Sequence, residues 1–132
     1  RQAARFKLSI NEQLLRVRET LTTWQSEGTR VALWGGTGKG AALINMFGID
    51  ANLVPMVIDS DERKRGGFVP GTGQEIQTPE YLVDHPVDRI LICTNWRARD
   101  IEREIREECG LDVELFVYLD GGLRELTEST SL

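Results

Sequence analysis

Residues 35–40, GGTGKG, combine the residue types that most readily bind a phosphate group. They follow a short apolar run, RVALW at 30–34, and lead into a second apolar segment. Gly36, Gly38 and Ala41 fit the pattern G-x-G-x-x-A, which joins a strand to a helix in dinucleotide-binding folds. There the first glycine permits a tight turn, the second lets a ligand approach the backbone, and free amides at the helix start attract an anion. The spacing therefore predicts an anion-binding loop.

An acidic residue stands where such a loop requires one. Asp59 ends the next apolar run, VPMVID, about 20 residues after the glycines, where a carboxylate accepts hydrogen bonds from a ribose or sugar hydroxyl. Together the loop and Asp59 favour a nucleotide-like ligand. The alternative is a glycine turn that only switches the chain from strand to helix.

Lys39 lies in the loop, where it would face a phosphate or a neighbouring polar group. A P-loop would need Ser or Thr directly after this lysine and a glycine five residues before it, but Gly40 and Trp34 occupy those positions. The hydroxyl that would hold magnesium is missing, so the sequence argues against kinase or NTPase activity.

Further candidate ligand contacts lie in the charged, glycine-rich excursion at 60–78, in which we expect a small hairpin around PGTG, and at the end of the predicted strand at 88–96. Thr72, in the Pro-Gly-Thr-Gly turn within 63–82, and the pair Asn95-Trp96 are expected to line the mouth of the site. Asn95 could bond a base or sugar. Trp96 could stack on a ring or simply cover the core, and the basic residues 63–65 could meet phosphates or belong to a solvated loop.

A catalytic set is missing from the sequence. His85 is the one histidine, and Cys93 and Cys109 lack metal-ligand spacing, so metal centres and serine or cysteine triads lack their parts. We interpret both cysteines as reduced thiols of a cytoplasmic protein. We therefore assign neither a catalytic residue nor a metal site.

Periodicity predicts alternating helices and strands. The expected helices are 6–27, 39–47, one beginning at 78–80, and 97–110, and the expected strands are 30–34, 54–59, 88–96 and 113–119. Strands that alternate with helices imply a parallel sheet with right-handed crossovers. The fold class is thus α/β: a small Rossmann-like three-layer sandwich with a mostly parallel sheet of about four or five strands and an N-terminal helix.

One domain accounts for all 132 residues. Residues 1–28 form the N-terminal helix, which in a longer protein would be a connector; 29–126 form the core, and 127–132 a loose tail. A net charge of −5 disfavours nucleic acid as a partner. No apolar run reaches the roughly 20 residues of a membrane span, so we expect no membrane partner.

The order of these motifs resembles the C-terminal domain of S-adenosylmethionine-dependent C-methyltransferases, including those that act on nucleotide-linked deoxysugars. The similarity covers about residues 6–120. The residues that carry it are the turn 35–40, Asp59, Lys64, Gly66, Pro70-Gly71-Thr72, Ile76, Pro79-Glu80, Asn95-Trp96 and Ile101-Glu102. In the family the aromatic pair is Trp-Asn, whereas this chain has Asn-Trp.

The resemblance implies an accessory role for this domain. S-adenosylmethionine and the catalytic residues would belong to an upstream domain, joined in cis or in trans, and this domain would help hold a small-molecule or sugar-nucleotide substrate against it. A different reading of the glycine pattern is an NAD(P)-type dinucleotide-binding or sensor module. A third is a structural domain that presents a partner interface on its first helix.

Overall fold

In the computed structural model, which describes residues 8–132, the first helix begins with a capping box. Helix α1 spans Ile10–Ser26 and is preceded by Ser9 as its N-cap. The Ser9 hydroxyl accepts a hydrogen bond from the Glu12 amide at 3.1 Å, and the Glu12 carboxylate accepts one from the Ser9 amide at 3.4 Å. This reciprocal capping box satisfies two amides that a helix start leaves free. The first residues of the expected helix, 6 and 7, lie outside the described part.

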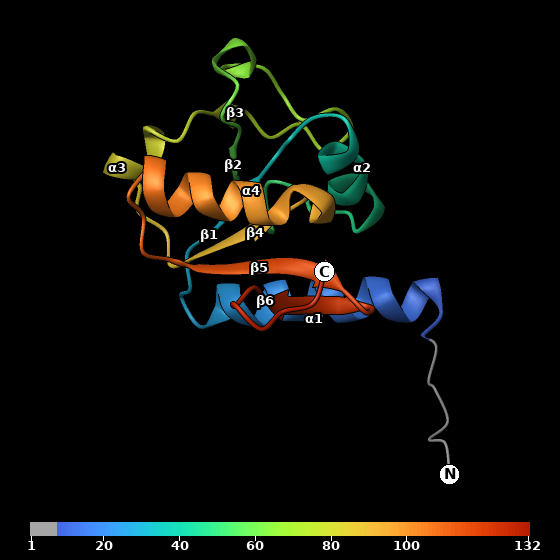
Figure 1. Cartoon of the computed structure of the whole chain (residues 1–132). Coiled ribbons are helices and arrows are strands. Elements are labelled where there is room, and N and C mark those ends of the chain that lie inside the picture. Colours follow the sequence, from blue (N-terminus) through green and yellow to red (C-terminus); the bar gives the residue numbers. More distant parts are fainter. Residues whose placement is uncertain (1–7) are drawn as a thin grey trace.

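Six strands form one sheet in the order β3-β2-β1-β4-β5-β6 (Figure 1). Their bounds are Val31–Trp34 for β1, Met56–Ile58 for β2, Ile76–Gln77 for β3, Arg89–Ile92 for β4, Glu114–Leu119 for β5 and Gly122–Glu125 for β6. All neighbours pair in parallel except β5 and β6, which are antiparallel. The mostly parallel sheet is confirmed, with six strands rather than the expected four or five.

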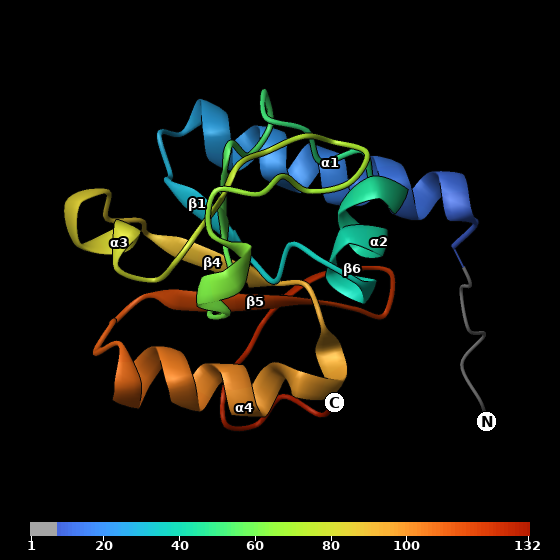
Figure 2. The same cartoon turned by 90° about the horizontal axis from the view of Figure 1, so that it is seen from above.

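Helices cover both faces of the sheet, which confirms the three layers (Figure 2). Helices α1 and α2 (Lys39–Met46) pack on one face around a core that includes Leu21, Leu33 and Ile44. On the other face α3 (Tyr81–Asp84) and α4 (Ala98–Arg103) enclose a second core that includes Ile90 and Ile105. Helix α4 continues into a π-helical turn, η3 (Glu104–Glu108).

The two strands that were not predicted, β3 and β6, form in different ways. β6 follows a hairpin turn in which Asp120 and Gly121 both have positive φ, 53° and 80°. An Asp-Gly pair in this conformation closes a two-residue hairpin. β3 has only two residues and lies inside the long excursion at 60–78, which also contains the expected small hairpin, marked by the antiparallel bridge Phe68–Glu75.

Several element ends differ from the expectation. Pro55 lies just before β2 because it has no N–H to give to the sheet. Glu80, the last residue of the expected start at 78–80, is the N-cap of α3. Beyond Glu125 the tail is tied to α4, because Arg99 donates hydrogen bonds to the carbonyls of Thr127 and Thr130 at 2.8 and 2.7 Å.

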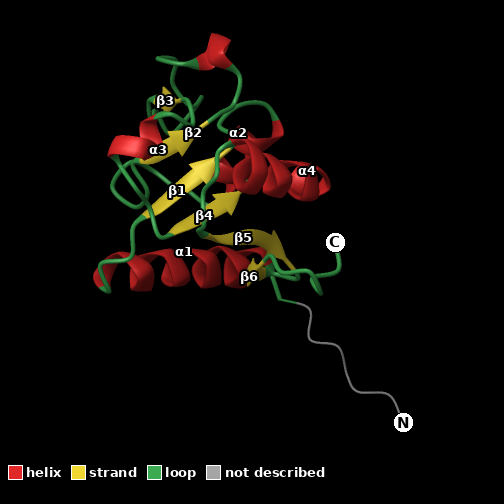
Figure 3. Ribbon diagram, turned by 60° about the vertical axis from the view of Figure 1, so that its left-hand side comes forward, coloured by secondary structure: helices red, strands yellow, loops and turns green. Residues whose placement is uncertain are grey.

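The register of the central strands positions the site. Trp34, the last residue of β1, pairs with Ile58 of β2 and with Ile92 of β4. The three strands therefore end side by side, and the segments that follow them meet at one edge (Figure 3). That edge is where open parallel sheets bind ligands. Between Leu8 and Leu132, no helix combines the length and apolar character needed to cross a membrane.

Candidate functional site

A pocket of about 420 Å³ opens at the edge of the sheet where β1, β2 and β4 end. Three segments line it: the glycine-rich loop, the residues that follow β2, and the turn that follows β4. Four of the residues predicted for the site line it together, namely Gly38, Lys39, Asp59 and Trp96. The topology thus brings residues that are far apart in sequence to one place.

The glycines of the loop have distinct steric roles. Gly35 and Gly38 adopt positive φ, 96° and 57°, a region that side chains disfavour. Gly36 does not; a Cβ there would lie 2.6 Å from Cγ1 of Val57, so its small size serves packing below the loop. A Cβ at Gly40 would lie 2.2 Å from the carbonyl oxygen of Gly35. The turn that the pattern assigns to Gly36 is therefore made by Gly35, and the close approach of helix to loop occurs at Gly40.

Backbone amides at the start of α2 are available to a ligand. In the described part of the chain, no backbone carbonyl accepts a hydrogen bond from the amides of Thr37, Gly38 or Lys39. The amides of Gly40 and Ala41 turn back to the Thr37 carbonyl instead. Gly38 is the N-cap and offers no side chain of its own to the free amides. Such amides at a helix start, together with the helix dipole, favour a bound anion.

Cationic side chains outnumber carboxylates around the pocket. Lys39, Lys64 and Arg97 line it, against Asp59 and Asp61. The ammonium of Lys64 donates a hydrogen bond to the hydroxyl of Thr37, which places this charge beside the glycine loop. The lining is therefore net positive in a chain whose overall charge is −5, and this contrast favours an anionic ligand.

The carboxylates are held by their own contacts. Oδ1 of Asp59 accepts a hydrogen bond from the amide of Asp61 at 2.9 Å, which fixes the Asp59 side chain at the end of β2. Asp61 is paired with Arg63 at 2.9 Å, and the hydrogen bond from this guanidinium lowers the pKa of Asp61. Within the described residues, the hydrogen bond to Asp59 uses Oδ1, which leaves Oδ2 open toward the pocket.

The other predicted residues lie outside the pocket lining. Gly36 is buried beneath the loop. Thr72 donates to Oε1 of Gln74 in the excursion, away from the pocket. Asn95 donates through Nδ2 to the Tyr118 carbonyl, which fastens the short helical turn η2 (Asn95–Arg97) to β5. Asn95 and Trp96 line a neighbouring apolar hollow.

Several lining residues were not proposed as ligand contacts from the sequence. They include Ser60, Asp61 and Arg97. Each of them comes directly or shortly after the end of a predicted strand. This position in the chain was the feature of the sequence that could have predicted their place in the pocket wall. The contact between Lys64 and Thr37, 27 positions apart, is tertiary and leaves no local pattern.

Glu104 lies behind the pocket and should make stability depend on pH. Burial raises the pKa of Glu104, against a hydrogen bond from Ser60 that lowers it. The pKa of Glu104 is therefore higher in the folded state than in the unfolded state, so the protonated side chain stabilises the fold. This stabilisation is fully present below the unfolded-state pKa and is lost as pH rises through the folded-state pKa. We expect Glu104→Gln to raise the Tm by about 1–2 °C at pH 7 and by less at pH 4, measured by thermal unfolding.

Removing one negative charge from an acidic chain could itself raise the Tm. Glu107→Gln is the matched control, since Glu107 is on the same turn but its side chain is 70% exposed. An equal rise in Tm for both variants at pH 7 would contradict the assignment to Glu104.

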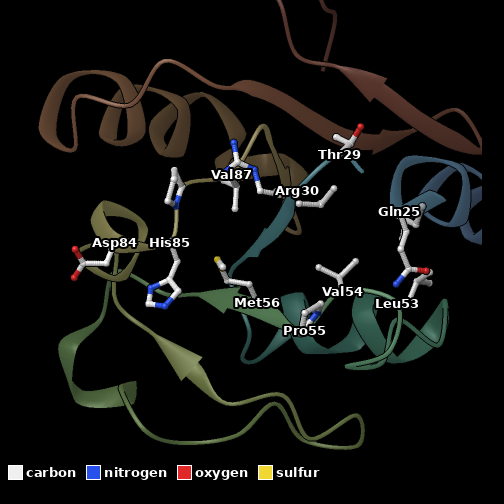
Figure 4. A pocket seen from close by; sticks show the side chains of 13 residues that line it. Gln25, Thr29, Arg30, Leu53, Val54, Pro55, Met56, Asp84, His85 and Val87 are labelled. Atoms are coloured by element: carbon white, nitrogen blue, oxygen red, sulfur yellow. The ribbon is translucent and has the colours of Figure 1, made fainter. Parts of the chain in front are cut away.

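A different hollow, of about 440 Å³, lies at the opposite edge of the sheet (Figure 4). Its walls are mainly apolar and include Leu53, Met56 and Val87. Arg30 at its rim is paired with Asp88 at 3.2 Å, so this cation is already neutralised. With this cation paired and its walls mainly apolar, the hollow fits an anion less well than the pocket above the strand ends.

A known protein family matches most of the chain. A family model described as the C-methyltransferase C-terminal domain matches residues 2–114. That span contains the whole glycine loop, Asp59 and the Asn95-Trp96 pair. No relative among the curated proteins matched the chain. Because the family model covers most of the chain, the protein belongs to the C-methyltransferase C-terminal domain family.

Proposed function

We propose that this domain is the accessory substrate-binding part of a C-methyltransferase. It holds the anionic portion of the substrate, a nucleotide-linked sugar, against a catalytic domain that binds S-adenosylmethionine. The observation that supports this is the convergence of free amides, Lys39, Lys64 and Asp59 in one pocket. The amides and lysines would receive phosphate oxygens, and Asp59 would accept a hydrogen bond from a sugar or ribose hydroxyl.

Methyl transfer itself is assigned to the upstream domain because this chain's reactive side chains are poorly placed for it. Cys93 is fully buried, and burial raises the pKa of its thiol to about 12. His85 stacks on Tyr81 at the edge of the sheet remote from the pocket, with ring centroids 3.9 Å apart. Neither side chain can act as a base on a substrate held above the strand ends.

The position of the segment that leads into α1 supports this arrangement. Leu8, the first described residue, lies against the β5–β6 turn at Gly121, and Gln13 of α1 accepts a hydrogen bond from the Tyr118 hydroxyl. The start of α1 and the turn between β5 and β6 both lie at the edge where the parallel strands end (Figure 3). An upstream domain would thus reach this domain on the side that carries the pocket.

A second candidate is an NAD(P)-type dinucleotide module. It is favoured by Ala41, which is buried where the fingerprint requires a small residue, and by Asp59 at the end of β2. Both candidates use the same loop, so the identity of the ligand separates them.

Calorimetric titration tests the proposal. Uridine or thymidine diphosphate sugars should bind the folded domain, and Lys64→Met should weaken that binding about tenfold or more, because a charge-assisted contact to phosphate is lost. Arg124→Gln is the control, since it removes one positive charge from β6, outside the pocket lining. Tighter binding of NAD than of any diphosphate sugar would favour the second candidate, and absence of binding by all of them would contradict both.

A further inference from the structure

Trp96 differs from the other two tryptophans of the chain. Trp24 and Trp34 are buried in the two cores, at 7% and 2% exposure, whereas Trp96 is 65% exposed. It lies in the short turn η2 and lines both the pocket and the apolar hollow beside it. One exposed aromatic residue is unremarkable on its own, so its contacts decide what it does.

The indole of Trp96 holds the side chain of Lys39. Nζ of Lys39 lies 4.9 Å from the ring centroid, within the range of a cation–π contact. Lys39 is the first residue of α2, where the helix dipole repels a positive charge. No ion pair joins Lys39 to a carboxylate of the described residues. The ring therefore supplies the attraction that keeps this flexible ammonium at the pocket.

The turn that carries Trp96 is itself anchored. Asn95, the preceding residue, donates to the Tyr118 carbonyl of β5. The ring therefore belongs to a turn that is tied to the sheet, and it offers the lysine a fixed position. Asn95 thus acts on the pocket indirectly, through its neighbour.

Two lysines consequently reach the pocket from separate elements. Lys64 is fixed on the hydroxyl of Thr37, and Lys39 is held by Trp96. Two ammonium groups held on separate elements offer one charged contact to each of two linked phosphoryl groups, and a monophosphate supplies fewer oxygens for the pair. The pocket therefore fits two linked phosphoryl groups.

We propose that Trp96 is a positioning residue that makes this pocket select a diphosphate over a monophosphate by holding Lys39. The inference rests on the proposed function and assigns to one side chain the choice between these two ligand classes. Trp96 acts through Lys39, so its ring is needed and its polar N–H is not.

The test compares the affinities of UDP and UMP, and of TDP and TMP, by calorimetry. Of the uridine and thymidine nucleotides, we consider the pair that binds more tightly. For that pair, wild type should bind the diphosphate about tenfold more tightly than the monophosphate, which corresponds to one charged contact. Trp96→Ala should bring this ratio near unity, and Trp96→Phe should restore most of it because the ring face is retained. In a Lys39→Met background, Trp96→Ala should change the ratio no further.

The outcomes separate this inference from the proposed function. Absence of binding of every nucleotide by wild type would contradict the proposed function and the inference with it. Binding by wild type with a ratio that Trp96→Ala leaves unchanged would overturn the inference alone. The same would follow if Trp96→Ala lowered the ratio equally in the Lys39→Met background, since Trp96 would then act independently of Lys39. Unfolding curves of the variants show that each is folded.

Discussion

Replacing Gly40 by alanine is expected to destabilise the domain by about 3 kcal/mol and to abolish ligand binding at the pocket. A Cβ at this position would lie 2.2 Å from the carbonyl oxygen and 2.9 Å from the carbonyl carbon of Gly35. Both atoms belong to backbone, so no side-chain rotation relieves the overlap. The start of α2 must move away from the loop, and the free amides then lose their common direction. Urea unfolding measures the first effect, and titration with a diphosphate sugar measures the second.

Gly122→Ala is the matched control for this substitution. Its Cβ would lie 3.2 Å from Cδ of Arg16, a flexible side chain that can move aside. Gly122 also lies in β6, where alanine is tolerated. We expect its free energy of unfolding to stay within about 0.5 kcal/mol of wild type. If Gly40→Ala unfolded at the wild-type urea concentration, the tight approach of helix and loop would be wrong.

The sequence predicted correctly those features of the fold that depend on residues close together in the chain. The runs at 30–34 and 88–96 alternate with amphipathic segments, and this order alone implies parallel strands covered by helices. The capping box at Ser9 is equally local, because both partners lie within one turn. Strand ends were less well predicted. The expected strand at 88–96 was too long, since its last residues turn away from the sheet into η2.

Features without a local signature could not be predicted in the same way. β3 pairs through only two residues, inside a segment whose charge and glycine content indicate a loop. The π-helical turn at Glu104–Glu108 could not be told from an α-helix in the sequence, because it continues the amphipathic pattern of α4. β6 is different, because Asp120-Gly121 is a hairpin signal that the sequence does contain.

The candidate site shows the same division. Gly38, Lys39, Asp59 and Trp96 could be placed together because each lies at the end of a predicted parallel strand or shortly after it. The contacts of Lys64 with Thr37 and of Trp96 with Lys39 depend on how side chains cross from one loop to another. Strand order brings the loops together, but only tertiary packing decides which charged groups meet.

Replacing Ile105 by alanine is expected to lower the free energy of unfolding by about 3 kcal/mol. Ile105 lies in the π-helical turn, is fully buried, and belongs to the core between α4 and the sheet. The side chain points into this core, and its truncation leaves a cavity that the surrounding strands cannot close. Urea unfolding followed by far-UV circular dichroism gives the midpoint and the slope.

Ile10→Ala is the matched control, with the same atoms removed from a residue that is 62% exposed at the start of α1. Its unfolding free energy should change by about 0.5 kcal/mol or less. A comparable loss for both variants would mean that burial does not explain the effect. A small loss for Ile105→Ala alone would place η3 outside the cooperative core, so that the layer behind the pocket could open without unfolding the sheet. Because η3 carries Glu104 next to Ser60 in the pocket wall, the stability of this turn also decides how rigidly that wall is held.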